Sequence, residues 1–388
     1  MSEIWTMVAV GLATLLALVP ARRPRSARTL SFWLGYLLNE LPFLAFYWLV
    51  AWTALALADL HVSSGEGLAV LALALTIAAL LTVVAWRGLA TGREVTRALR
   101  RELGLRPDSA PIGDHTRRRR LLRVLPRIMF CPVPLRRRGV RRTANIGYGD
   151  GGRAHRLDVY RHRSRPTGAP VLVHFHGGHF RRGAKSREGR ALLHRLAQQG
   201  WVCVSANYRL RQAGRFPASL IDAKRVIAWV REHGAEYGAD SSLLIVAGSS
   251  AGAHLASMAA LTAGDPAFQP GFESADTSVG AAVCLYGFYG ARQLDGPRPS
   301  SPRAYIGADA PPFFIAHGDN DTLVPVDRAA DFADALRHVS LSPVVYAQLH
   351  GAQHCFDLVR SLRYEQVIDG IETFLGWLRA SREPERVV

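Results

Sequence analysis

The sequence has few cysteines, and they do not stand in paired spacing. Its 388 residues include four, Cys131, Cys203, Cys284 and Cys355. A disulfide framework or a zinc site needs cysteines or histidines at short intervals, so this pattern indicates neither. Cys203 and Cys284 stand inside apolar runs and are expected to be small core residues.

Charge is scarce over residues 1–86, which hold four Arg and four acidic residues. Long apolar stretches run instead through residues 4–19, 30–60 and 67–86. The first and third have about the length that a bilayer requires, roughly 20 residues. In the second stretch, an aromatic-rich interfacial piece is expected before a span over residues 41–60. The sequence therefore predicts an N-terminal helical transmembrane region of about three helices.

Two other interpretations of these stretches stay open. A secretory signal peptide would carry a positive n-region and a clear small-residue cleavage site, and residues 1–19 show neither. The buried helices of a soluble bundle would also be apolar, but three such runs in succession favour a membrane.

The arginines indicate the orientation of the predicted spans. The first loop is basic and contains Arg22, Arg23, Arg25 and Arg28. The second loop contains Asp59, His61 and Glu66, without any Arg or Lys. By the positive-inside rule, the first loop and everything after Trp86 are cytoplasmic. We therefore expect a multi-pass protein of the cell membrane, with its N-terminus outside and its larger C-terminal part in the cytoplasm.

Residues 87–142 carry most of the positive charge, with 17 Arg and four acidic residues. Their net charge is +13, against +17 for the whole chain. A linker is expected here. Its Arg-rich stretch at residues 116–130 could lie on anionic lipid headgroups, with about 1 kcal/mol gained per Arg. A solvated charge run explains the pattern equally well. No nucleic-acid partner is expected, because a tether in the membrane makes lipid the nearer anion.

Residues 143–388 form a separate predicted domain, and their net charge is only about +4. Apolar runs alternate here with helical patterns. Such alternation predicts a mostly parallel sheet covered by helices on both faces, with ligands bound at the carboxyl ends of the strands. Strands are expected near residues 156–160, 171–175, 201–206, 243–247, 281–286, 313–317 and 344–349. Helices are expected near residues 186–199, 217–232 and 365–379.

The most informative motif is G-S-S-A-G at residues 248–252, a match to G-x-S-x-G. It follows the apolar run at residues 243–247 and precedes a helical pattern. In this setting the glycines permit a sharp turn, which lifts the hydroxyl of Ser250 clear of the sheet. The helix N-terminus favours negative charge nearby. Ser250 is therefore predicted to be a nucleophile.

Acyl transfer to a serine needs a base that takes the hydroxyl proton and an acid that orients this base. After Ser250, the acid candidates at strand ends are Asp319 and Asp321. The base candidates are His350 and His354. The residues by themselves leave both acids and both histidines open.

Residues 143–380 resemble the α/β-hydrolase superfamily, in particular its carboxylesterase/lipase branch related to hormone-sensitive lipase and arylformamidase-like esterases. The shared segments are H-G-G at 176–178, A-N-Y-R at 206–209, G-S-S-A-G-A-H-L at 248–255 and the loops at Asp321 and His354. Residues 264–273 also resemble actinobacterial membrane-linked esterases. The family order is Ser, Asp, His. Its acid stands in H-G-x-x-D-x-x-V and its base in G-x-x-H-x-F, and these patterns select Asp321 and His354.

The resemblance also implies an oxyanion hole, in which each backbone N–H stabilises charge on the substrate carbonyl oxygen by about 3 kcal/mol. In relatives, an H-G-G-G loop and the residue after the serine supply these donors. The positions correspond to Gly177, Gly178, His179 and Ala251. Many relatives have Gly where this chain has His179, so a side chain is expected at the mouth of the pocket.

Four nearby polar residues are expected to have structural roles. His176 is predicted to shape its loop, and His254 to pack on the helix behind Ser250. Ser249 is expected to face away from the site, and Asp222 to form a local ion pair.

The sequence thus predicts a serine carboxylesterase or lipase that works through a Ser-His-Asp triad and an acyl-enzyme, with neither cofactor nor metal. The expected substrate is an acyl ester of short to medium chain, or a lipid delivered from the bilayer. Amidase, formamidase or peptidase chemistry on the same triad is an alternative. A non-enzymatic membrane adaptor with a hydrolase fold is another, against which the intact triad and oxyanion loop argue.

Overall fold

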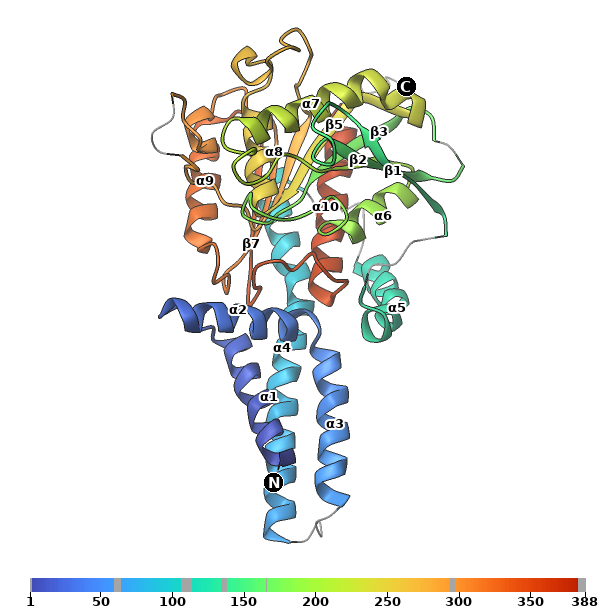
Figure 1. Ribbon diagram of the computed structural model, residues 1–388. Coiled ribbons are helices and arrows are strands. Elements are labelled where there is room, and N and C mark those ends of the chain that lie inside the picture. Colours follow the sequence, from blue (N-terminus) through green and yellow to red (C-terminus); the bar gives the residue numbers. More distant parts are fainter. Residues whose placement is uncertain are drawn as a thin grey trace.

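A narrow group of N-terminal helices carries a larger α/β part (Figure 1). The computed structural model describes residues 2–58, 64–105, 114–133, 138–164, 166–293 and 297–382. Asp59 and His61 of the predicted second loop lie outside the described residues.

The α/β part is built on an eight-stranded sheet in the order β1-β2-β4-β3-β5-β6-β7-β8. Strands β1 and β2 run antiparallel to their neighbours, and the other strands are parallel. The parallel strands are almost continuously apolar, as burial on both faces requires. The strands are β1 (Val140–Gly147), β2 (Arg156–His162), β3 (Ala169–Phe175), β4 (Val202–Ala206), β5 (Ala239–Ser249), β6 (Ala281–Leu285), β7 (Phe313–Gly318) and β8 (Val344–Leu349).

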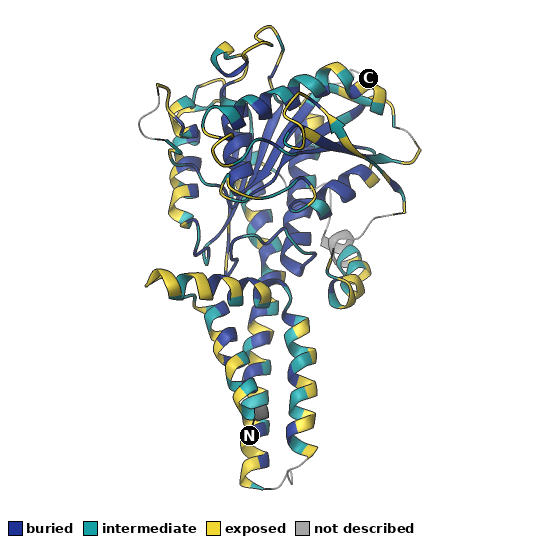
Figure 2. Cartoon of the chain, viewed as in Figure 1, coloured by how far each residue is buried: buried dark blue, intermediate teal, exposed yellow. Residues whose placement is uncertain are grey.

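Helices cover both faces of this sheet, which confirms the predicted α/β-hydrolase architecture. One core cluster joins the sheet to α7, α8 and α9, and a second joins it to α6, α10 and the end of α4. The strands between these layers are buried (Figure 2). The covering helices are α6 (Arg190–Gln198), α7 (Ala218–His233), α8 (Ala251–Leu261), α9 (Val326–Val339) and α10 (Leu362–Ala380).

Two elements of the α/β part were not predicted from the sequence. Strand β1 carries several polar residues on the sheet edge, so its pattern lacks the apolar run of the inner strands. Helix α9 buries Ala329, Phe332, Ala333 and Leu336. Their spacing of three and four residues is typical of a helix with one buried face, so the signal was present.

The N-terminal region consists of α1 (Ser2–Leu18), α2 (Arg25–Glu40), α3 (Pro42–Ala58) and the first half of α4 (Gly65–Leu103). Helices α1, α3 and α4 lie side by side, and α2 lies across their upper end (Figure 1). Over the described residues, one helix, α4, is long and apolar enough to cross a membrane. Helices α2 and α3 pass the same test only together and are bent by 90°, and α1 is shorter. The structure therefore supports one apolar helix, and three spans stay a prediction.

Helix α4 continues beyond the predicted end of the apolar region and into the α/β part. It is 39 residues long, so the predicted boundary between residues 86 and 87 falls inside it. Val95 and Leu99 are buried in the core cluster shared with α10. Small residues permit this contact, because a Cβ at Gly92 would lie 2.3 Å from Oε1 of Gln366. The first part of the predicted linker is thus a packed helix.

Polar contacts join the N-terminal helices to the carboxyl edge of the sheet. Nε of Arg363 donates to Oε1 of Glu40 at 3.1 Å, and both side chains are fully buried. Nδ2 of Asn320, in the loop after β7, donates to the carbonyl of Ala17 at 3.2 Å. The edge of the sheet at which an α/β protein binds its ligands therefore faces the helical region.

Candidate active site

Ser250 stands at the sharp turn between β5 and α8. Its backbone has φ 55° and ψ −114°, an uncommon conformation for a residue other than glycine. Gly248 and Gly252 make room for the turn. A Cβ at Gly248 would lie 2.1 Å from the carbonyl oxygen of Gly252, and a Cβ at Gly252 would lie 1.9 Å from that of Phe175. The turn therefore requires both glycines of the motif.

The three residues predicted as nucleophile, base and acid lie together at the carboxyl edge of the sheet. Oγ of Ser250 lies 2.9 Å from Nε2 of His354. Nδ1 of that histidine lies 2.6 Å from Oδ2 of Asp321. The residues come from the segments after β5, β8 and β7, and all three are buried. This hydrogen-bonded chain has the geometry that proton removal from a serine requires.

Several donors hold the Asp321 carboxylate. Oδ1 accepts from the backbone N–H groups of Leu323 and Val324, both at 2.8 Å. Oδ2 lies 3.2 Å from Nε2 of His317, in addition to its contact with His354. Burial opposes ionisation, but the charge of His354 and these hydrogen bonds outweigh it and hold the pKa of Asp321 well below its usual range. The acid therefore stays ionised beside the histidine.

The H-G-G loop after β3 presses against the serine turn. A Cβ at Gly177 would lie 3.2 Å from the Cβ of Ser250. Gly178 has φ 117°, and a Cβ there would lie 1.8 Å from the carbonyl oxygen of Arg182. Glycine at both positions therefore brings the backbone of this loop next to the nucleophile.

His179 and Ala251 complete the predicted oxyanion loop. Ala251 is the first residue of α8, so its N–H has no acceptor within the helix. His179 has φ 57° and lines the same cavity as Ser250. Burial, and then the charge of His354, lower the pKa of His179. The side chain that replaces the glycine of many relatives therefore stands at the mouth of the site as a neutral ring at neutral pH.

Comparisons with known proteins cover the same part of the chain. Residues 157–299 and 291–336 match the family model BD-FAE. Probable carboxylic ester hydrolase LipM of Mycobacterium tuberculosis is 43% identical over 285 residues, which cover 65% of each chain. Esterase LipQ of the same organism is 40% identical over 300 residues, which cover 70% of each chain. The chain belongs to the carboxylic ester hydrolases of the α/β-hydrolase superfamily.

Solved structures of other α/β-hydrolases have the same fold. Thermogutta terrifontis esterase 2 phosphorylated by paraoxon is 25% identical, with a TM-score of 0.53 over 62% of this chain and 95% of that chain. A truncated carbohydrate esterase from gut microbiota is 22% identical, with a TM-score of 0.52 over 60% of this chain and 96% of that chain. The second likeness shows the fold alone.

The other acid and base candidates of this α/β-hydrolase pair with each other, away from Ser250. Nδ1 of His350 lies 2.8 Å from Oδ2 of Asp319, and the His350 side chain is 57% exposed. The geometry therefore favours the same choice as the family patterns, Asp321 and His354.

The polar residues expected to be structural have partners outside the triad. Oγ of Ser249 donates to Oδ2 of Asp357 at 2.6 Å, so the hydroxyl points away from the nucleophile. Nε2 of His254 lies 2.9 Å from the carbonyl of Ser300. The ring of His176 stacks on that of Tyr208 at 4.4 Å.

Asp222 likewise forms the expected ion pair, with Nη2 of Arg209 at 2.7 Å, and a second contact with Nε2 of His155 at 3.1 Å. In the part of the chain that the structure describes, no three His, Cys, Asp or Glu side chains gather as a metal site would require.

Two buried acids beside the triad were missed in the sequence. Asp357 accepts hydrogen bonds from Ser249 and from the hydroxyl of Tyr286, whose ring lies 4.6 Å from that of His354. Burial raises the pKa of Asp357. Burial likewise raises the pKa of Glu188, which lies close to Gly177, to about 7. Asp357 follows the base by three residues, which was the one available hint.

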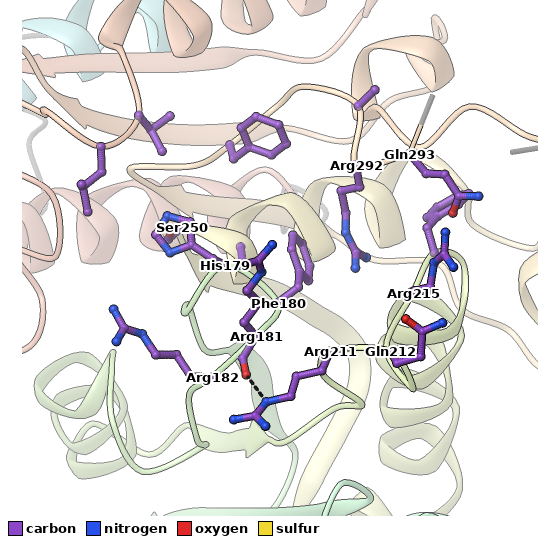
Figure 3. Close-up of a pocket in the computed structure, with 16 residues that line it drawn as sticks. His179, Phe180, Arg181, Arg182, Arg211, Gln212, Arg215, Ser250, Arg292 and Gln293 are labelled. Carbon is purple, nitrogen blue, oxygen red and sulfur yellow. Dashed lines mark hydrogen bonds between the residues drawn. The ribbon is translucent and has the colours of Figure 1, made fainter. Parts of the chain in front are cut away.

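A cavity of about 920 Å³ opens above Ser250. Phe180, Phe216 and Phe288 are its aromatic lining residues, and several arginines surround it (Figure 3). Its size falls within the range of small-molecule sites, about 300–1,000 Å³. An ester can therefore reach the serine from this side.

Helix α2 of the N-terminal region forms part of the site. A second cavity, of about 40 Å³, is lined by Phe32, Trp33 and Tyr36 together with Ser250 and His354. The rings of Phe32 and His354 lie 6.4 Å apart, edge to face. The sequence predicted an interfacial aromatic piece here but gave no sign that it contacts the predicted catalytic residues.

Proposed function

We propose that this protein is a membrane-anchored serine carboxylesterase whose nucleophile is Ser250. The observation that carries the proposal is the hydrogen-bonded chain from Ser250 through His354 to Asp321, at 2.9 and 2.6 Å. The motif turn and the adjoining H-G-G loop support it, because the reaction needs donors beside the nucleophile.

The reaction proceeds in two proton-balanced steps. His354 takes the proton of Ser250 as the hydroxyl oxygen attacks the ester carbonyl, and it then gives this proton to the leaving alcohol. His354 then takes a proton from water as the water oxygen attacks the acyl-serine, and it returns this proton to the oxygen of Ser250 as the carboxylic acid leaves. Asp321 keeps Nδ1 of His354 protonated and stabilises the imidazolium. The N–H groups of the loop at residues 177–179 and of Ala251 bind the oxyanion.

A fluorophosphonate probe tests this proposal, because it forms a bond only with an activated serine. Labelling and hydrolysis of 4-nitrophenyl butyrate are expected for the parent protein and should vanish in Ser250→Ala. Ser249→Ala, which removes the neighbouring hydroxyl, should still be labelled. Absence of labelling in the parent protein would favour the non-enzymatic adaptor. Formyl-kynurenine and a peptide amide in the same assay separate esterase from formamidase and peptidase activity.

We infer that α1, α3 and the first half of α4 lie in the membrane, with the catalytic domain on the cytoplasmic side. The support is a helical region with large apolar side chains on its outer surface, which water disfavours. These include Trp5, Leu12, Leu15, Val50, Leu55, Leu68 and Leu75. The basic first loop indicates the side. A topology reporter fused after Val388 should report the cytoplasm, and a periplasmic or external signal would overturn this orientation.

Part of the basic segment is proposed to lie on the lipid surface. Helix α5 (Asp114–Phe130) exposes Leu122 and Phe130 beside its arginines. The ring of Phe130 stacks on that of Tyr47 in α3 at 6.1 Å, near the start of that helix. Arg120 fastens α5 to Glu372 of α10 at 2.6 Å. Apolar and basic side chains together suit an anionic membrane surface.

The ester is proposed to come from this membrane surface. Helix α2 turns Phe32 and Tyr36 toward the catalytic residues and exposes Leu30, Trp33 and Leu37. Because α2 has apolar residues both toward the site and on its exposed surface, it can contact lipid and the site at the same time. The protein should therefore hydrolyse a short-chain ester faster when the ester is embedded in lipid vesicles than when the same ester is dissolved in detergent.

A further inference from the structure

The large cavity above Ser250 is strongly cationic. Its described lining residues include five arginines and no acidic residue: Arg181, Arg182, Arg211, Arg215 and Arg292. They come from the loops that follow β3, β4 and β6, so three separate segments direct positive charge to one place. Figure 3 shows these side chains around the cavity, with Ser250 on one side and Arg215 and Arg292 on the other.

Arg292 is held in place without a carboxylate partner among the described residues. Its guanidinium lies 3.4 Å from the centre of the Phe180 ring. It donates to Oγ of Ser219 at 2.6 Å and to the carbonyl oxygen of Gly214 at 2.9 Å. Burial lowers the pKa of Arg292 to about 10, which leaves the group charged at neutral pH. A fixed, partly desolvated cation favours the arrival of an anion.

The other arginines are exposed at the rim of the cavity. Nε of Arg211 donates to the carbonyl oxygen of Arg181 at 3.1 Å, which joins two of the loops (Figure 3). Elsewhere in the described structure, several arginines pair with acids, as Arg195 does with Glu365 at 2.7 Å. The described residues provide no such pair for the five arginines of the cavity. Like charges gathered in a cleft raise the local concentration of an oppositely charged ligand.

We propose that the ester cleaved by this protein carries a carboxylate or phosphate group, which Arg292 and Arg215 bind while Ser250 attacks the ester carbonyl. This inference rests on the proposed function. A planar guanidinium can form two parallel hydrogen bonds with either anion, so the site selects for charge as well as for shape. The phenylalanines contact the apolar part of the substrate.

Matched ester pairs test this proposal with the full-length protein in detergent. In the first pair, 4-nitrophenyl pentanoate is compared with the 4-nitrophenyl monoester of pentanedioic acid, which adds a carboxylate on the acyl side. In the second, phenyl acetate is compared with 4-acetoxybenzoate, which adds a carboxylate on the alcohol side. At least one anionic ester should have the higher kcat/KM, by about tenfold. This preference should shrink as salt rises from about 0.01 M to about 1 M, because the Debye length falls about tenfold.

Variants connect the preference to the arginines. Arg292→Gln and Arg215→Gln should each lower the ratio of anionic to neutral kcat/KM by about tenfold. Arg292→Lys, which keeps the charge, should keep part of the preference. Arg163→Gln serves as the matched control, because Arg163 is exposed directly after β2 and does not line the cavity.

Two outcomes are distinguishable from a failure of the proposed function. If neutral esters are hydrolysed and neither anionic ester is preferred, the anion site is wrong while the esterase stands. An unchanged ratio in both glutamine variants would overturn the roles of these arginines. If no ester is hydrolysed and Ser250 is not labelled, the proposed function itself has failed.

Discussion

Ser249 and Ser250 are neighbours in the chain, yet their hydroxyl groups point in different directions and contact different residues. The positive φ of Ser250 turns its side chain toward His354. Ser249 is the last residue of β5, and its hydroxyl donates to the buried Asp357. The two roles follow from one backbone turn, and two glycines make that turn possible.

We expect His179 to affect the shape of the pocket mouth more than the rate of bond making. Its side chain lines both cavities, while only its backbone N–H is needed for an oxyanion. His179→Gly should therefore change the ranking of esters by acyl size several-fold and leave the best substrate active. Steady-state kinetics over a series of 4-nitrophenyl esters measures this. A variant as inactive as Ser250→Ala would contradict the assignment.

Glu188 should make the folded protein less stable as the pH rises. Burial raises the pKa of Glu188 to about 7, above its ordinary value of 4.5, so the native state binds this proton more tightly than the unfolded state. The native state is then favoured at low pH, and ionisation costs up to about 3 kcal/mol above pH 7. Relative to the parent, Glu188→Gln should gain thermal stability between about pH 5 and about pH 8.

Thermal unfolding at both pH values measures the change. Glu232→Gln is the matched control, since that side chain is 76% exposed. An equal shift of the melting temperature at both pH values would assign the effect of Glu188→Gln to packing instead of charge.

At the scale of elements, α2 connects the N-terminal helical region to the α/β part, which the sequence predicted to be separate regions. The sequence predicted an aromatic-rich interfacial stretch before a span, and its position at a membrane surface stays a prediction. Its contact with the predicted catalytic residues depends on the 90° bend between α2 and α3. Pro42 favours a break at this point, but it does not encode the angle of the bend. The surface of α2 that touches the site could not be chosen either, because apolar residues lie on both of its sides.

Phe32 should limit the length of the acyl chain. It forms one wall of the 40 Å³ cavity beside Ser250, and alanine there would enlarge that space. Phe32→Ala should shift the optimum of a 4-nitrophenyl ester series toward longer chains, by several-fold in kcat/KM. Leu30→Ala is the control, because Leu30 is exposed on the same helix. The same chain-length profile in both variants would show that α2 does not shape the site.

At the scale of the whole molecule, α4 makes one continuous connection between the apolar region and the α/β part. The helix begins at Gly65 and ends at Leu103, and its last turns pack on α10. The change from apolar to Arg-rich sequence at residue 86 suggested a domain boundary. A single helix can contain such a change when its two halves pack in different surroundings. The position of the active site relative to the apolar helices is therefore fixed by packing.

The buried pair of Glu40 and Arg363 should hold the two parts together. Removal of one charge leaves the other buried and unpaired, at a cost of about 3–5 kcal/mol. Glu40→Gln should therefore lower the melting temperature in detergent, by much more than Glu66→Gln, whose side chain is exposed on α4. The double variant Glu40→Gln with Arg363→Met should recover part of the loss. Equal melting temperatures for Glu40→Gln and Glu66→Gln would rule out this role.

The sequence by itself determined the elements and chemistry that depend on local order. Apolar runs predicted the inner strands, and the G-x-S-x-G turn predicted Ser250. The residues alone left two acids and two histidines open, and the family patterns selected Asp321 and His354. Tertiary structure alone decided the contacts between distant segments. Asp357 behind the triad, α2 against His354 and five arginines around one cavity come from loops and helices far apart in the chain. Such contacts arise only when the sheet brings the ends of its strands to a common edge.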